Sequence, residues 1–180
     1  MTITDQQRAL RIYAFLWSIA GPAIRLLLYL RCIRGKEELA RLPERTGKGW
    51  HNQRPDGPLI WLHAVSVGES VAARTLADTL LQRDQDVCIL ITTNTVTAAA
   101  EIAKASKKWQ GRCLHSYQPL DHKKWVDRFL SYWRPDCAVF LESDFWPMLI
   151  TQSRARFIPI IFASARLSPH SLTKWRRRPA

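Results

Sequence analysis

Short apolar runs alternate along most of the chain with segments that carry apolar side chains at helical spacing. A continuous apolar run of this kind is typical of a strand buried on both faces of a sheet. We expect strands at residues 59–62, 87–93, 112–117, 137–141 and 157–163. We expect helices at residues 69–82, 96–106 and 122–133. Strands that alternate with helices in this way predict an α/β fold, with a parallel sheet, right-handed crossovers and helices on its faces.

The longest apolar stretch precedes this region and covers residues 12–30. Its length is close to the roughly 20 residues that cross a bilayer, although Arg25 lies inside it and Pro22 would kink a helix there. A membrane anchor or interfacial helix, a cleaved signal peptide and a buried core helix are the three interpretations. The anchor is favoured because basic residues follow at once, which also predicts that the rest is cytoplasmic. We therefore divide the chain into a membrane-associated segment, residues 1–34, and a domain, residues 35–180.

The 180 residues carry a formal net charge of +12, which implies a negatively charged partner such as anionic lipid, nucleic acid or a phosphorylated substrate. Nucleic acid is disfavoured, because the tryptophans are scattered and form no stacking platform. A solvated linker with a short helix over residues 36–42 is one interpretation of the basic segment after the apolar stretch. The other is an anionic lipid site made by Arg31, Arg34, Lys36, Arg41 and Arg45.

The four cysteines are widely separated, and none has a second cysteine or a histidine at metal-ligand spacing. This pattern disfavours a zinc site and a disulfide framework, and indicates a reducing compartment. The chain also contains no G-x-G-x-x-G and no Walker sequence, so dinucleotide-binding and NTP-hydrolysing enzymes lose their main support. We expect neither a metal nor a cofactor.

Candidate catalytic groups lie where predicted strands end. The sequence LIWLHAVSVGES places Glu69 where a buried strand passes into a helix. Ligands of open α/β sheets bind at the carboxyl ends of strands, but an acidic residue in a first helical turn can also simply complement the helix dipole. The ends of two later strands add Glu142, Asp144 and Arg166, for which structural ion pairs are the alternative. His63, among apolar neighbours, is interpreted as a hydrogen-bonded core histidine.

A series of short motifs extends along almost the whole chain after the apolar stretch. They are Arg34-Gly35-Lys36-Glu37, Glu44-Arg45-x-Gly47, Trp61-x-His63-Ala64-x-Ser66-Val67-Gly68-Glu69, Thr92-Thr93-x-Thr95, Pro119-x-Asp121, Glu142-Ser143-Asp144-Phe145-Trp146-Pro147 and Ala165-Arg166-Leu167-Ser168. In this order they resemble the Kdo transferases of Gram-negative bacteria, which move 3-deoxy-D-manno-octulosonic acid (Kdo) from CMP-Kdo to the lipid A precursor. The third and sixth motifs make the resemblance specific, although Ser143 and Asp144 stand where Thr and Glu are usual in that family.

The resemblance implies the Rossmann-like N-terminal domain of a GT-B glycosyltransferase, which binds the acceptor, requires no metal and works with inversion at the anomeric carbon. It assigns Glu69 as the general base and Glu142 as a second functional carboxylate. We place Ser66, Gly68 and Arg166, with the basic residues named above, on the acceptor or lipid side. The acceptor would be the lipid A precursor at the cytoplasmic face of the inner membrane.

Members of that family are longer than this chain, and the resemblance stops before the second domain that holds the CMP-sugar. We therefore expect the donor-binding domain to be absent from these residues, so that the chain forms the acceptor-side half of an enzyme. The alternative function is a non-catalytic, membrane-bound lipid-binding module, or a truncated and inactive remnant of such an enzyme.

Overall fold

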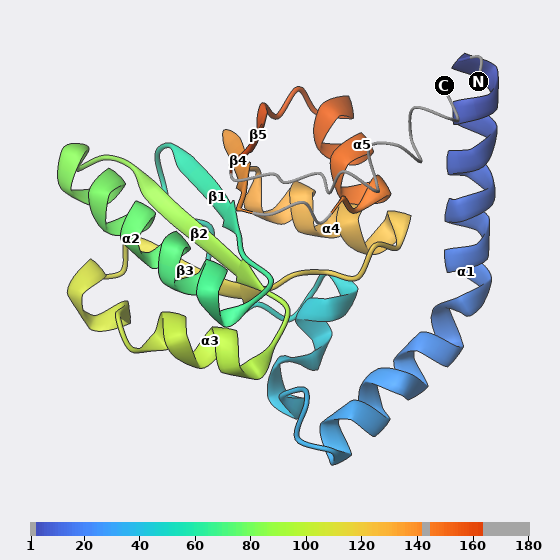
Figure 1. The fold of residues 1–180 in the computed structure, drawn as a ribbon, viewed down its shortest axis with the longest axis horizontal. Helices are drawn as coiled ribbons and strands as arrows, with labels where there is room; N and C mark the ends of the chain where they lie inside the picture. The colour runs from blue at the N-terminus through green and yellow to red at the C-terminus, as the bar shows by residue number, and fades with distance from the viewer. Residues whose placement is uncertain (1–2, 142–144, 164–180) are drawn as a thin grey trace, which may run out of the picture.

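The computed structural model describes residues 3–141 and 145–163, and one parallel sheet forms its centre (Figure 1). Its strands are β1 (Leu59–His63), β2 (Cys88–Thr93), β3 (Cys113–Tyr117), β4 (Cys137–Phe140) and β5 (Ile160–Phe162). They lie in the order β3-β2-β1-β4-β5, and every neighbouring pair is parallel. The predicted α/β fold is confirmed, and each strand overlaps the apolar run that predicted it.

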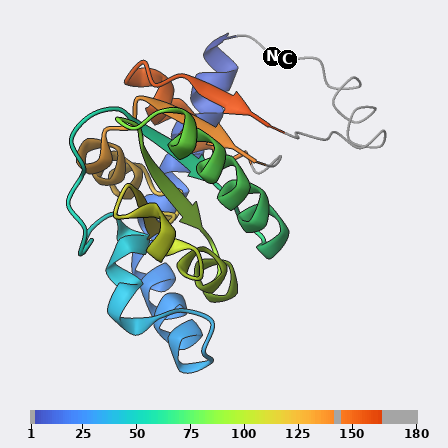
Figure 2. The ribbon, with the colours of Figure 1, turned by 90° about the vertical axis from the view of Figure 1, so that its left-hand side faces the viewer.

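Helices cover both faces of the sheet (Figures 1 and 2). On one face lie α2 (Val67–Arg83), α3 (Val96–Ala103) and the short 3₁₀ helix η2 (Ser106–Trp109). On the other lie α4 (Lys123–Trp133) and α5 (Pro147–Ala155). The sheet is therefore the middle layer of three, as its continuous apolar strands require.

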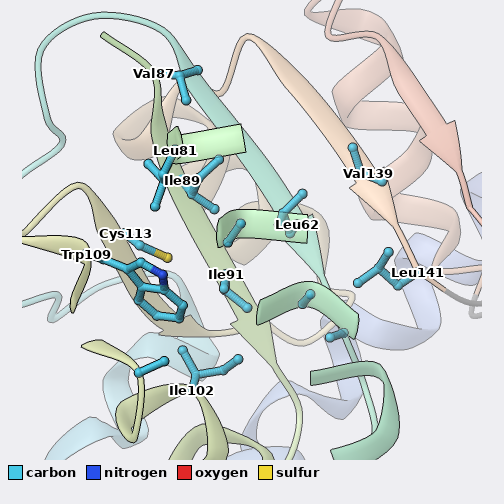
Figure 3. Packing of buried hydrophobic residues seen from close by; sticks show 14 residues of the cluster. Leu62, Leu81, Val87, Ile89, Ile91, Ile102, Trp109, Cys113, Val139 and Leu141 are labelled. Carbon is cyan, nitrogen blue, oxygen red and sulfur yellow. The ribbon is translucent and has the colours of Figure 1, made fainter. Parts of the chain in front are cut away.

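Alternate strand residues supply the two halves of the core. Leu62 and Ile91 point to one face and pack with Leu81 of α2, as Figure 3 shows. Trp61 and Leu90 point to the opposite face and pack against α4. All these side chains are buried, and burial of a large apolar side chain contributes roughly 1.5–3 kcal/mol.

The apolar N-terminal stretch forms one long helix, α1 (Ile3–Ile33), which runs along the α4 and α5 side of the domain (Figure 1). It contacts the domain at three positions along its length. The Tyr13 hydroxyl donates a hydrogen bond of 2.8 Å to Asp121 Oδ2, the Arg25 guanidinium lies 5.9 Å from the centre of the Trp125 ring, and Leu28 is buried. The helix continues through Pro22, and its direction changes along its length in Figure 1.

Two elements differ from the sequence predictions. The expected helix over residues 36–42 is instead a 3₁₀ helix, η1 (Leu39–Thr46), which contains Pro43 and is anchored by buried residues at its C-terminal end. The second difference is the helix α5, which the sequence analysis did not predict. It is short, and its first free amides are capped from a distant part of the chain, since Met148 and Leu149 donate hydrogen bonds of 3.0 and 2.9 Å to the carboxylate of Asp121.

The strand order reverses between β1 and β4, because the chain moves from β1 to β2 and β3 and then returns to the other side of β1. Such a reversal opens a crevice outside the carboxyl ends of the two central strands, where ligands of doubly wound sheets bind. The segment between β1 and α2, which carries Ser66, borders this crevice.

Candidate active site

Glu69 lies in the first turn of α2, directly after the carboxyl end of β1. Ser66 is the N-cap of this helix, and its hydroxyl accepts a hydrogen bond of 3.3 Å from the Glu69 amide. The Glu69 carboxylate accepts in return from the amides of Val65 at 2.7 Å and Ser66 at 3.1 Å, and it also bonds with the Ser66 hydroxyl. The turn is thus a capping box, and Glu69 does have the helix-stabilising role that its position allows.

Capping leaves one acceptor position on the Glu69 carboxylate. A carboxylate can accept about four hydrogen bonds. Within the described residues, Oε1 accepts from the amide and hydroxyl of Ser66, whereas Oε2 accepts only from Val65. Glu69 as a whole is 8% exposed, and the second position on Oε2 is not used by the described residues. The helix-capping role and proton abstraction are therefore compatible.

Gly68 keeps the approach to this turn open. Its φ does not lie in the left-handed region, so the backbone there does not require glycine. A Cβ added to Gly68 would meet nothing nearer than Ser66 Oγ, at 4.0 Å. The fold itself would therefore accept a side chain at this position, and a ligand-binding role of Gly68 stays a prediction.

His63 ends β1 and is buried, as expected of a core histidine. Its Nδ1 lies 2.9 Å from the Thr92 hydroxyl, which also accepts a bond of 2.7 Å from Trp61 Nε1. Burial lowers the pKa of His63 to about 3, because a charged imidazole would lose its hydration. His63 is therefore neutral near pH 7 and supports the end of β1, the strand that precedes the turn with the candidate base.

Arg45 is a correction to the proposed set of lipid-binding residues. Only 2% of it is exposed, and its guanidinium pairs with Glu37 at 3.0 Å. It also donates bonds of 3.2 Å to the side-chain oxygen of Asn94 and to the carbonyl of Gln118. These partners hold together the ends of β2 and β3, so Arg45 has a structural role and its charge is neutralised inside the protein.

The Arg41 side chain also forms its contacts within the domain. It forms a two-pronged pair with Glu44, with distances of 2.8 and 2.9 Å, and its guanidinium lies 4.6 Å from the centre of the Tyr117 ring. The following Gly47 has a left-handed φ of 69°, and a Cβ there would lie 2.2 Å from the carbonyl oxygen of Trp125. The Glu44-Arg45-x-Gly47 motif therefore docks η1 onto the domain. Arg41 contributes to this packing but stays partly exposed, so its role in lipid binding stays a prediction.

Of the five basic residues, the remaining three lie where α1 ends. Arg31 pairs with Glu37 at 3.1 Å but stays partly exposed. Arg34 and Lys36 are exposed. These two carry the positive charge that is open to solvent beside the C-terminal end of α1.

Comparison with known proteins places this site in a family. A family model described as 3-deoxy-D-manno-octulosonic-acid transferase (kdotransferase) matches residues 40–180. The chain belongs to this Kdo transferase family. It is 38% identical over 165 residues to a probable mitochondrial 3-deoxy-D-manno-octulosonic acid transferase of Arabidopsis thaliana, and 33% identical over 169 residues to the 3-deoxy-D-manno-octulosonic acid transferase of Rickettsia bellii. A Haemophilus influenzae enzyme of the same name is 33% identical over 163 residues.

The comparisons also show that this Kdo transferase chain matches only a part of its relatives. The alignments cover 92%, 94% and 91% of the chain, but 36%, 39% and 38% of the Arabidopsis, Rickettsia and Haemophilus proteins. This agrees with the prediction that the resemblance is limited to an N-terminal half.

Three predicted site residues, Glu142, Asp144 and Arg166, lie outside the described residues. Ser66, Gly68 and Glu69 are brought together in one turn, whereas Arg34 and Lys36 lie at the end of α1. No group of three or more His, Cys, Asp or Glu that could hold a metal ion is found in residues 3–141 and 145–163. That this Kdo transferase family member needs no metal stays a prediction.

Sequence reasoning gave no role to Asp121, which the structure shows to be a junction. Its buried carboxylate accepts from Tyr13 of α1 and from the first free amides of α5. Burial raises the pKa of Asp121 against the lowering effect of these donors. The signal was present in the Pro119-x-Asp121 motif, but only the fold shows that its partners come from both ends of the chain.

Proposed function

We propose that the chain is the acceptor-side half of an inverting Kdo transferase, which moves Kdo from CMP-Kdo to the lipid A precursor in lipopolysaccharide biosynthesis. Membership of the family and the match along the domain support the activity. We assign the donor CMP-Kdo to a second domain, which would correspond to the remaining length of the relatives. No cofactor is part of this proposal.

The observation that carries the mechanism is the Glu69 carboxylate at the reversal of strand order, with one acceptor position open on Oε2. A sugar hydroxyl is a weak nucleophile while it keeps its proton. Glu69 would accept that proton as the hydroxyl oxygen forms its bond to the anomeric carbon of Kdo and the bond to the CMP phosphate breaks. General-base catalysis of this kind contributes roughly 10²–10⁴-fold to the rate. Attack opposite the leaving phosphate gives inversion in a single displacement.

The same proposal places α1 against the cytoplasmic face of the inner membrane. Residues 7–33 of α1 have the length and composition of a membrane-spanning helix, with a mean hydropathy of 1.4 in the best window. Large apolar side chains on the side away from the domain are exposed, including Phe15, Ile19 and Leu26. Arg34 and Lys36 follow at the end of the helix, where they can attract anionic lipid.

Replacement of Glu69 tests the mechanism. Kdo transfer from CMP-Kdo to a lipid A precursor is measured in detergent, with the chain alone and with a separately produced donor-binding domain. We expect transfer only in the mixture, and a loss of roughly 10²–10⁴-fold for Glu69→Gln. Glu101→Gln on α3, which removes a carboxylate from an ion pair with Arg74, is the matched control and should keep full activity. If Glu69→Gln keeps most of the activity, Glu69 is not the base.

The second candidate function is the non-catalytic lipid-binding module or inactive remnant, which would keep the exposed apolar face of α1 and lack turnover. The same assay separates the two. No transfer in the mixture, together with preserved binding to anionic vesicles, would favour the module. Transfer by the chain alone would show that the donor site lies within these residues.

A further inference from the structure

A cavity of about 260 Å³ lies between α1 and the segments that follow the carboxyl ends of the central strands. Its apolar wall is formed by Ile24, Leu27 and Leu28 of α1. Gln118, just after β3, and Trp146, just before α5, line it as well. The cavity is separate from the Ser66–Glu69 turn, since none of those residues lines it.

Among residues 3–141 and 145–163, two buried polar atoms in this wall find no hydrogen-bond partner. Gln118 is 2% exposed, and its side-chain oxygen is unpaired. Trp146 Nε1 is buried and unpaired too. By contrast, the Gln118 backbone is fully used: its amide donates to Thr93 at 3.1 Å and its carbonyl accepts from Arg45 at 3.2 Å. Buried polar groups are normally paired, so an unpaired acceptor and an unpaired donor in one cavity wall point to a ligand that supplies both partners.

A hydroxyl group meets that requirement, because its hydrogen can be donated to Gln118 Oε1 while its oxygen accepts from Trp146 Nε1–H. The α1 side of the wall is hydrocarbon at Ile24, Leu27 and Leu28, so the ligand is apolar where it contacts them. The remaining lining includes the paired side chains of Glu37 and Arg45, together with Asn94. At about 260 Å³ the cavity is slightly smaller than the usual range for ligand pockets, about 300–1,000 Å³. It therefore fits one portion of a larger molecule.

The side chain of Leu27 connects the cavity to the outer surface of α1. It lines the cavity and is nevertheless more than half exposed, next to the exposed Leu26. Arg31 adds a partly exposed cation at the same wall. An amphiphile that lies along the outer face of α1 can therefore enter past Leu27 with its hydrocarbon still in apolar surroundings.

We propose that this cavity binds a membrane lipid that carries a hydroxyl group at the junction of its polar head and its hydrocarbon. The hydroxyl bonds to Gln118 and Trp146, and the adjoining chain lies against α1. The inference rests on the part of the proposed function that puts α1 at a membrane, and it is independent of the role of Glu69.

The test uses a matched pair of probes, dioctanoylglycerol and its O-methyl ether, of which only the first has a hydroxyl hydrogen to donate. Binding to the chain is measured by calorimetry in detergent micelles. We expect the alcohol to bind about tenfold more tightly than the ether. Gln118→Met, which keeps the side-chain length and removes the acceptor, should reduce this ratio to about one. Gln53→Met at an exposed glutamine is the control and should leave the ratio unchanged.

A second variant, Leu27→Trp, keeps the proposal testable if Gln118→Met fails to fold. This change on an exposed position of α1 narrows the cavity entrance and should abolish binding of both probes, while the circular dichroism spectrum stays that of the parent. Equal binding of alcohol and ether by the parent chain would overturn the proposal and leave a cavity that holds water only.

Flotation with anionic vesicles separates this inference from the proposed function. A chain that floats but shows no preference for the alcohol overturns the lipid site alone. A chain that prefers the alcohol in micelles but does not float keeps the site and contradicts the membrane role of α1. Neither the flotation experiment nor the binding experiment measures Kdo transfer, so both results are independent of catalysis.

Discussion

The apolar stretches of α1 and β1 have a similar composition but opposite surroundings. In β1 the side chains of Leu59, Trp61 and Leu62 are completely buried between two layers of helices. In α1, Phe15 is 63% exposed, and many of its apolar neighbours are exposed as well. Exposed apolar surface of this extent on a soluble domain marks a site of interaction. The apolar side chains of β1 therefore stabilise the fold, whereas most of those on α1 remain exposed, as the proposed contact with lipid requires.

The basic side chains show the same contrast between the buried interior and the exposed surface. Arg45 lies inside the domain with its charge neutralised by Glu37, and Arg34 lies in solvent at the end of α1. Both were expected to bind lipid because both are basic residues in one short segment. The charge of Arg45 therefore stabilises the domain, whereas the charge of Arg34 is open to solvent, where we propose that it attracts anionic lipid.

The largest effect is expected when Arg45 is compared with Arg34. Arg45→Met should lower the free energy of unfolding by about 3–5 kcal/mol, because it leaves Glu37 buried beside only the partly exposed Arg31. Arg34→Met should change it by no more than about 0.5 kcal/mol, but should weaken binding to anionic vesicles by about 1 kcal/mol at low salt. Urea unfolding and flotation at two salt concentrations measure the two quantities. Similar losses of stability in both variants would remove the distinction between the two cations.

A second pair of variants compares the apolar positions directly. Leu62→Ala deletes a fully buried side chain and should cost about 2–5 kcal/mol of folding free energy. Leu26→Ala, at a position that is 61% exposed, should cost about 0.5 kcal/mol or less and reduce the affinity for vesicles by about tenfold. Denaturant unfolding in detergent and vesicle flotation are the measurements. If Leu26→Ala destabilised the fold as much as Leu62→Ala, the outer face of α1 would be packed in the protein and would not be available to lipid.

The sequence predicted what depends on local pattern. Each strand was visible as an apolar run, and the turn at Glu69 was located because a buried strand and an amphipathic helix meet there. The burial of Arg45 could not be predicted, since its partners Glu37, Asn94 and Gln118 converge only when the ends of β2 and β3 are in place. The same applies to α5, whose cap, Asp121, lies 27 residues before the first amide that it accepts.

The smallest expected effect is the change of the free energy of unfolding with pH. It should depend on the buried histidines and not on the exposed ones. Burial lowers the pKa of His63 and of His115 to about 3, against an ordinary value near 6.5. Below pH 6.5 the unfolded chain takes up protons that the folded chain does not, so stability should fall as the pH decreases from 6.5 toward 3. Each histidine contributes a slope of up to about 1.4 kcal/mol per pH unit.

Asp121 has the opposite sign, because its raised pKa makes the folded state the stronger proton binder just above pH 3.8. Between pH 6.5 and 5 the histidines therefore dominate, and urea unfolding of His63→Gln should show a smaller slope than the parent. Part of the slope should remain, because burial also lowers the pKa of His115 and of His122. His51→Gln, at an exposed position, is the control and should keep the full slope. A parent chain whose stability does not change across this window would contradict the neutral, buried state of His63, and with it the support that His63 gives to the end of β1.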